Sequence, residues 1–324
     1  MHGEQCDTEK VLHNYTTSAN VRARWKLYEL AAHVVDIEQD AYFSLPPQAG
    51  SVLADVGSSD GQFLERTALE FGHDGLRIAL DVQSSQFTDS TISNSLLRTQ
   101  LAKIVNNKAF LNELDQSPYL QDKLFLPLAG DATALPLKDD SVDRLYELFM
   151  LYHVPTDKLH TALDEAMRVL KSAGHLVLAT SGVDNKQVHR DIEAHIASTI
   201  GPNTLPPPRM NMSFTTELAT QTLPEYAIKH GLHVYAGFQN TDMIIESFKD
   251  VELYLGSQRS MLDQYSPIPH TTAFEEALNQ ARYEIYHDIV TKGRFTDTIR
   301  RSMFIMSKHP VEIGKTALSF EQLC

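Results

Sequence analysis

The apolar residues of this chain fall into short runs that alternate with amphipathic helical stretches. Apolar runs occupy residues 51–57, 76–83, 124–130, 142–151 and 174–180, and each run predicts a buried strand. Apolar residues at helical spacing cover residues 62–72 and 156–170, where Thr156 is the expected N-cap of the second helix. Strands that alternate with helices predict an α/β fold, a doubly wound parallel sheet covered on both faces.

Composition excludes several classes of protein. Of the 324 residues, 42% are hydrophobic and 22% are charged, which suits a soluble globular protein. No run of about 18 apolar residues occurs, so we expect no membrane span. The N-terminus lacks the pattern of a signal peptide, and Cys6 and Cys324 form neither a metal-ligand spacing nor a disulfide framework. We therefore expect a cytoplasmic protein without a bound metal.

The charge balance bears on the binding partner. The formal net charge is −14 at pH 7, whereas proteins that follow a phosphate backbone usually carry a basic face. We expect no nucleic acid and a small-molecule partner, and the sequence leaves a homo-oligomer open.

The stretch VLADVGSSDGQFLE, at residues 52–65, has three interpretations. G-x-S-x-G around Ser59 is the nucleophile elbow of α/β-hydrolases, but only one predicted strand precedes it. A nicotinamide or flavin loop needs G-x-G-x-x-G, and two of those three glycines are missing. The third pattern, acid-x-Gly-x-(Gly/Ala/Ser)-x-Gly, is filled by Asp55, Gly57, Ser59 and Gly61, and it is typical of a loop that holds S-adenosylmethionine.

Each residue of the third interpretation has a physical role. Asp55 would attract the ammonium of the methionine part, and the glycines would let the backbone approach the ligand. Asp81 would accept hydrogen bonds from the ribose hydroxyls, and Asp131 from the adenine amino group. The predicted cofactor-binding residues are Asp55, Gly57, Ser59, Gly61, Asp81, Val82, Asp131, Ala132, Glu147 and Leu148.

At these residues the chain resembles the class I S-adenosylmethionine-dependent methyltransferases. It looks closest to the small-molecule branch that includes the ubiquinone/menaquinone-biosynthesis C-methyltransferases. That branch reads roughly Asp-Ala-x-x-Leu-Pro-Phe-x-Asp-x-Ser-Phe-Asp, then Leu-His-His, then Arg-Val-Leu-Lys-Pro-Gly-Gly; this chain reads DATALPLKDDSVD, LYH and RVLKSAGH. The resemblance covers about residues 50–182. It implies a Rossmann-like sheet of seven strands with the last one antiparallel, to which residues 232–238 and 300–309 would add strands six and seven.

The resemblance also implies a division of the chain. Residues 1–45 are expected to form an N-terminal helical lid, and 46–182 a cofactor-binding Rossmann-like core. Residues 183–310 would hold the rest of the sheet with substrate-cap insertions, and 311–324 a peripheral tail. Two departures stand out. Tyr152 replaces the first histidine of the His-His pair, and the 50 residues from Asp81 to Asp131 imply inserted helices at about 84–123.

The expected reaction is transfer of a methyl group by in-line displacement to a small organic acceptor with an apolar body. The methylated atom, oxygen, nitrogen or carbon, stays open. His153 follows the fourth predicted strand and is the candidate general base, although such a histidine can also cap a loop. The alternatives are a protein or RNA methyltransferase, or a non-catalytic subunit that binds the cofactor.

Overall fold

The computed structural model describes residues 28, 35–82, 125–200, 213–255 and 272–324. Most of the predicted N-terminal lid and the predicted insertion at 84–123 lie outside these residues. Within the described part, no helix combines the length and the apolar character needed to cross a membrane.

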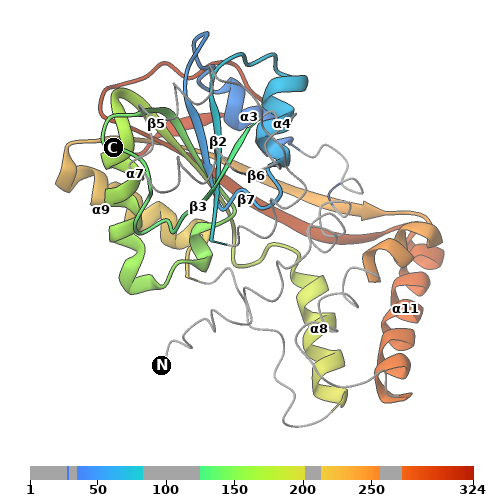
Figure 1. Ribbon diagram of the computed structural model, residues 1–324. Helices are drawn as coiled ribbons and strands as arrows, with labels where there is room; N and C mark the ends of the chain where they lie inside the picture. Colours follow the sequence, from blue (N-terminus) through green and yellow to red (C-terminus); the bar gives the residue numbers. More distant parts are fainter. Residues whose placement is uncertain (1–27, 29–34, 83–124, 201–212, 256–271) are drawn as a thin grey trace, which may run out of the picture. The chain divides into compact units, whose positions relative to one another are not determined.

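Eight strands form one sheet, in the order β3-β2-β1-β4-β5-β7-β6-β8 (Figure 1). The strands are β1 (Leu53–Val56), β2 (Arg77–Asp81), β3 (Leu126–Ala129), β4 (Val142–Leu148), β5 (Leu170–Ser181), β6 (His233–Ile245), β7 (Phe295–Ser307) and β8 (Phe320–Gln322). Strands β3, β2, β1, β4 and β5 pair in parallel, each with its neighbour. The predicted α/β fold is confirmed.

One strand lies outside the seven-strand prediction. The short strand β8 pairs antiparallel with β6, where Tyr235 is opposite Gln322, so the sheet has an antiparallel edge. Three residues, two of them polar and exposed, are too short a run for apolar periodicity to detect.

Helices cover both faces of the first five strands. They are α3 (Ile37–Phe43), α4 (Gln62–Leu69), α7 (Leu159–Val169) and α9 (Thr216–His230). Leu145 of β4 belongs to the apolar core that α7 and α9 share, whereas the ring of the next residue, Tyr146, meets Phe63 of α4 edge to face at 4.8 Å. Consecutive residues of a strand face opposite sides of a sheet, so these contacts place α7 and α4 on opposite faces.

Two local predictions around α7 are wrong. Thr156 does not cap this helix, because residues Thr156–Lys158 form a separate 3₁₀ turn and Lys158 precedes α7. The predicted start of the fifth strand at Gly174 is wrong as well, since β5 begins at Leu170, directly after α7. A register shift between Val142 and Arg144 on β4 accommodates the added strand residues. Between the pairs Val142–Leu170 and Arg144–His175, four residues of β5 lie opposite one residue of β4, so residues 171–174 form an irregularity in the ladder.

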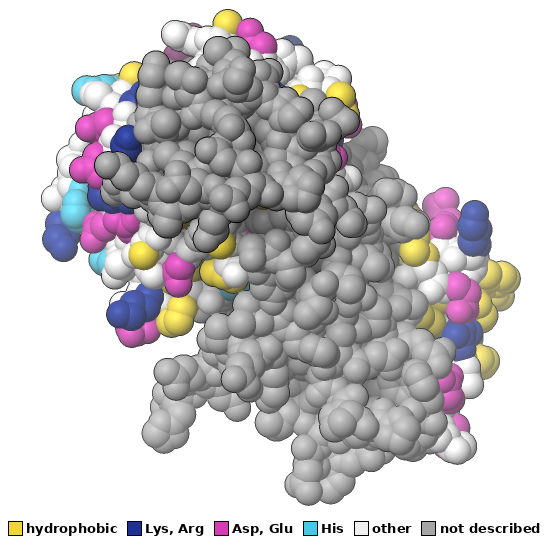
Figure 2. Space-filling model, viewed as in Figure 1, with side chains coloured by type: hydrophobic (Ala, Val, Ile, Leu, Met, Phe, Trp, Pro, Cys, Tyr) yellow, Lys and Arg dark blue, Asp and Glu magenta, His cyan; other side chains and the backbone are white. Residues whose placement is uncertain are grey.

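The chain divides into two compact units. The larger unit comprises Asp36–Ser181, Ser213–Phe238 and Ser302–Cys324, and the smaller comprises Met1–Val35, Gly182–Met212 and Gln239–Arg301. In the smaller unit, α8 (Gln187–Ile200) and α11 (Thr272–Lys292) lie side by side (Figure 1). Figure 2 shows acidic, basic and apolar side chains mixed on the outer face of α11, where Tyr283 and Val290 are exposed.

Candidate cofactor-binding site

A tight loop joins β1 to α4. Gly57, Ser59 and Gly61 all have positive φ angles, of 73°, 53° and 79°. The Gly57 N–H donates to the Leu80 carbonyl of β2 at 2.7 Å, and the Gly61 N–H donates to the Ser58 carbonyl at 2.9 Å. Gly61 then begins α4 as its N-cap. The loop thus lies at the carboxyl ends of β1 and β2, the edge at which doubly wound sheets bind ligands.

Glycine is required at two of these positions for space as well as for conformation. A Cβ atom at Gly57 would lie 2.6 Å from the Cβ of Met150, which follows β4. A Cβ atom at Gly61 would lie 2.2 Å from the ring of Phe125, which precedes β3. The loop is therefore packed against the segments that flank β3 and β4, and the glycine pattern reflects this packing.

Asp81 at the end of β2 is tied to the same loop. Its Oδ2 accepts a hydrogen bond from the Ser59 N–H at 3.0 Å. This bond stabilises Ser59 in a left-handed conformation that is uncommon for a residue other than glycine. A carboxylate offers about four acceptor positions, so the same group has capacity for the hydroxyls of a ribose.

The loop after β3 carries Asp131 and Ala132. The Gly130 N–H donates to the Asp81 carbonyl at 3.0 Å, which places the start of this loop beside the end of β2. Asp131 Oδ1 accepts from both the N–H and the hydroxyl of Thr133, each at 2.7 Å. Among the described residues, Asp131 Oδ2 has no hydrogen-bond donor, so it can accept a bond from a ligand. The Ala132 side chain is buried in the core.

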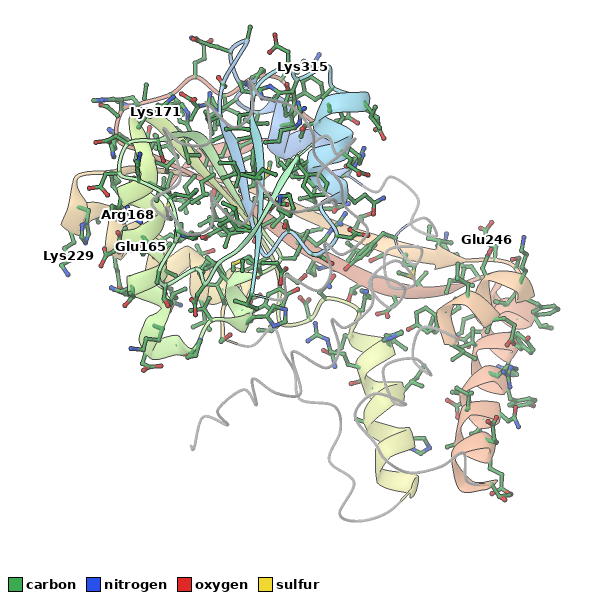
Figure 3. The ribbon with its side chains drawn as sticks, viewed as in Figure 1. Glu165, Arg168, Lys171, Lys229, Glu246 and Lys315 are labelled. Atoms are coloured by element: carbon green, nitrogen blue, oxygen red, sulfur yellow. The ribbon has the colours of Figure 1, made fainter. Side chains whose placement is uncertain are left out.

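Two charged residues of α7 hold that loop in shape. Figure 3 labels both Glu165 and Arg168. Arg168 donates to the carbonyls of Leu135 and Leu137 at 3.1 and 2.9 Å. Glu165 accepts from the Leu135 N–H at 2.9 Å and pairs with Arg168 at 2.7 Å. Arg168 is the arginine of the RVLK motif, so this part of the family signature fixes the loop that bears Asp131.

Carboxyl groups gather around the β1 loop. Asp55 is 4% exposed, and burial raises its pKa well above the ordinary value. The negative charges of Glu38, Asp81 and Glu147 raise the pKa further. Glu38 of α3 is paired with Arg66 of α4, yet burial still raises its pKa. This concentration of acidic groups favours a positively charged ligand.

Glu147 is the most deeply buried of these acids. Its side chain is fully buried, and within the described residues neither carboxyl oxygen has a hydrogen-bond partner. Burial raises its pKa to about 8. Asp55 is opposite Tyr146 in the β1–β4 register, so Glu147 and Asp55 face opposite sides of the sheet.

The remaining predicted residues lie at the ends of β2 and β4. Val82 follows Asp81 and is 59% exposed, which leaves its apolar side chain accessible. Leu148 ends β4 and is half-buried. His153 ends a 3₁₀ turn, Leu151–His153, and its N–H donates to the Met150 carbonyl at 2.8 Å. Since Met150 packs on Gly57, His153 lies one short turn beyond a residue that contacts the glycine loop.

Sequence reasoning brought most of these residues to one edge of the sheet, but it missed Glu38, Met150 and Phe125. Glu38 precedes the Pro-Pro turn and carries no motif. Its effect on the pKa of Asp55 becomes visible only when α3 packs beside α4. Met150 and Phe125 belong to none of the recognised motifs. Their close approach to Gly57 and Gly61 is visible only in the structure.

Part of the chain is similar to a known family of domains. Residues 54–178 match the sequence profile described as a methyltransferase domain. Residues 54–178, less than half of the 324-residue chain, are thus similar to a methyltransferase domain. The matched region runs from β1 to β5 and contains the loop after β1, Asp81, the Asp131 loop and His153. None of the curated proteins matches the chain.

Solved structures with a similar course of the chain include several methyltransferases. Phosphoethanolamine N-methyltransferase 2 of Haemonchus contortus, in complex with S-adenosyl-L-methionine, is 14% identical, with a TM-score of 0.42 over 84% of this chain and 52% of that one. This chain thus spans about half the length of that enzyme. YcgJ of Bacillus subtilis is 13% identical, with a TM-score of 0.42 over 85% of this chain and 97% of that one.

A further similar structure comes from Anabaena variabilis, a protein assigned as a methyltransferase from an antibiotic biosynthesis pathway. It is 16% identical, with a TM-score of 0.49 over 83% of this chain and 95% of that one. At these identities and scores, the neighbours bear on neither the acceptor nor the mechanism of this chain.

Proposed function

We propose that this protein is a methyltransferase, which moves a methyl group from S-adenosylmethionine to a small organic acceptor with an apolar body, as the ubiquinone-type branch does. The cofactor would be held by Asp55, by the loop from Gly57 to Gly61 and by Asp81. Asp131 and Ala132 would bind its adenine, and Val82, Glu147 and Leu148 would complete its surroundings.

The observation that carries the proposed cofactor site is the group of carboxyls around the glycine loop. Asp55 and Glu147 are buried and have raised pKa values, and in water their charged forms would be far better solvated. A ligand that brings an ammonium and a sulfonium would favour the ionised forms of these carboxyls and lower their pKa values. The bound cofactor supplies a methyl group already activated on a positively charged sulfur.

The chain's own contribution to catalysis is mainly alignment and exclusion of water. The loop packed on Met150 and Phe125 would fix the cofactor at the sheet edge. His153 would accept the proton of an acceptor that still holds one. Its ring packs on the ring of Tyr152 at 4.5 Å between centroids, which limits its orientations.

A small acceptor is supported by the way in which the smaller unit is built. Its residues come from the connections between β5 and β6 and between β6 and β7, together with the N-terminal segment. Long connections that fold into a compact unit are suited to enclosing an organic metabolite, since ligand pockets bury most of a small ligand's surface.

A methyl-transfer assay tests the proposal. The enzyme is incubated with S-adenosylmethionine labelled in its methyl group and, separately, with a small-molecule fraction, bulk protein and bulk RNA. We expect label in the small-molecule fraction, and a His153→Ala variant that loses kcat while its affinity for S-adenosylhomocysteine is unchanged. Label only in protein or RNA would contradict the small acceptor, and full kcat in the variant would remove His153 from the mechanism.

A further inference from the structure

The smaller unit contains a cluster of cationic and donor groups that the methyl-transfer site does not use. Lys186 lies just before α8, and Arg301 lies on β7. The Lys186 Nζ and the Arg301 Cζ are each 4.4 Å from the centre of the Tyr28 ring. Two cations against one aromatic ring concentrate positive charge in a protein whose formal net charge is −14.

Gln239 of β6 supplies a buried donor to this cluster. Its Oε1 accepts from the Arg301 Nε at 2.9 Å and from the Arg301 Nη2 at 2.6 Å. An arginine only donates hydrogen bonds, so the oxygen of the amide must face it and the Nε2 group must face elsewhere. That Nε2 is buried, the residue is 4% exposed, and no described residue accepts a bond from it.

A buried amide donor without an acceptor is costly. The lost solvation of such a group destabilises the folded protein, unless a ligand or an ordered water accepts the bond. The amide orientation that creates this donor is fixed by two hydrogen bonds to Arg301, so a simple rotation of the side chain cannot relieve it without breaking both.

The backbone around the cluster is held rigidly. Lys186 has a φ of 53°, which is uncommon for lysine, and its N–H donates to the Thr298 carbonyl at 2.7 Å. The side chain of Asn185 accepts from the Arg300 N–H at 2.9 Å. Arg301 Nη2 also donates to the Val35 carbonyl at 2.9 Å. Backbone strain of this kind recurs at ligand sites, where groups are fixed before the ligand arrives.

The positive charge of the cluster lowers the pKa of Tyr28. Burial alone would raise the pKa of its phenol, but Lys186 and Arg301, aided by hydrogen bonds from Asn185 and Lys186, bring the pKa down to about 8. The surroundings of this ring therefore favour a negative charge over a neutral group. The phenol is still mostly protonated at pH 7.

We propose that Tyr28, Lys186, Gln239 and Arg301 form a binding site for an oxyanion group, a carboxylate or a phosphate. Gln239 Nε2 would donate to one oxygen of the anion, and the positive charges of Lys186 and Arg301 would attract it. The hydroxyl of Tyr28 would donate to a second oxygen. The site belongs wholly to the smaller unit and does not depend on the methyl acceptor.

Tyr28 provides the readout for a test on the full chain. Tyrosinate has its own ultraviolet absorption, and a Tyr28→Phe variant identifies the transition near pH 8. Inorganic phosphate or acetate is then added in separate titrations. A bound anion should raise the pKa of Tyr28 by about one unit, because it offsets the two cations. A rise with phosphate alone assigns the site to phosphates, with acetate alone to carboxylates, and with both to oxyanions in general.

Two variants decide whether the cluster is the site. Gln239→Glu keeps acceptor oxygens for Arg301 but replaces the donor by a negative group, and Lys186→Met removes one cation. We expect each to abolish the response to the anion. Lys292→Met, which removes an exposed lysine paired with Asp288 on α11, should respond like the wild type. No response to either anion in the wild type, or a full response in Lys186→Met, would overturn the proposal.

Discussion

At the scale of single residues, the buried acids of the proposed cofactor site lower the stability of the folded protein. Asp55 and Glu147 are buried where an apolar side chain would pack at lower cost, and burial raises the pKa of both. Buried ionisable groups with shifted pKa values are typical of functional sites. The sequence could identify Asp55 by its motif, whereas the isolation of Glu147 depends on the packing around β4.

Replacement of Glu147 by Gln should change how stability depends on pH. The folded-state pKa of Glu147 is about 8, above the ordinary 4.5, so between these values the folded protein keeps a proton that the unfolded chain has lost. The free energy of unfolding therefore falls as pH rises through this window, by up to about 1.4 kcal/mol per pH unit from this residue. Glu147→Gln should lose that part of the slope in denaturant titrations from pH 4.5 to 8.

Glu276→Gln is the matched control, because Glu276 is an exposed glutamate on α11. Its pH profile should follow that of the wild type. If Glu147→Gln kept the full slope between pH 4.5 and 8, the carboxyl of Glu147 would not be buried and isolated as described.

At the scale of elements, the β1 loop and the loop after β3 are held by contacts that the sequence only partly reveals. The glycine spacing predicted a tight turn, and the alternation of strands placed Asp81 and Asp131 at the same sheet edge. The RVLK motif was recognised only as part of a family pattern. Its physical reason, a bond network from Arg168 to two loop carbonyls, required the structure. Local preference failed at Thr156, where a separate 3₁₀ turn precedes α7.

Gly61→Ala and Gly72→Ala separate crowding from backbone strain. Both glycines have positive φ, of 79° and 72°, but only a Cβ at Gly61 meets the Phe125 ring; at Gly72 nothing lies within 4 Å. Strain alone should cost each variant about 1–2 kcal/mol of unfolding free energy. Gly61→Ala should lose about 1–3 kcal/mol more, since overpacking displaces Phe125. Equal losses in thermal or denaturant unfolding would argue against the close packing of the loop.

Arg168→Met should loosen the loop that bears Asp131. The variant loses the bonds to Leu135 and Leu137 and the pair with Glu165, which should reduce stability by about 1–3 kcal/mol. It should also weaken binding of S-adenosylhomocysteine, although Arg168 is assigned no contact with the ligand. Arg282→Met, which removes an arginine paired with Glu252 on the smaller unit, is the control. Its affinity for S-adenosylhomocysteine should equal that of the wild type. Unchanged cofactor affinity in Arg168→Met would mean that the loop keeps its shape without the arginine.

At the scale of the whole molecule, the sequence predicted the α/β architecture, whereas the division into lid, core, cap insertions and tail stays a prediction. Apolar periodicity identified β1 to β5 because each is a buried run, and the strand order follows from the fold class. The structure adds that the smaller unit combines segments that are far apart in the sequence. The cluster of Tyr28, Lys186, Gln239 and Arg301 escaped detection for the same reason.

Direct binding of the cofactor tests the central claim most sharply. Calorimetry with S-adenosylhomocysteine should show one site per chain in the wild type. Asp81→Ala should bind more weakly by about 2–4 kcal/mol, since charge-assisted hydrogen bonds to the ribose are lost. Asp242→Ala, which removes an exposed acid of β6 outside the proposed contacts, should bind as the wild type does. Neither heat nor a thermal shift at millimolar ligand, or full affinity in Asp81→Ala, would contradict the account of this site.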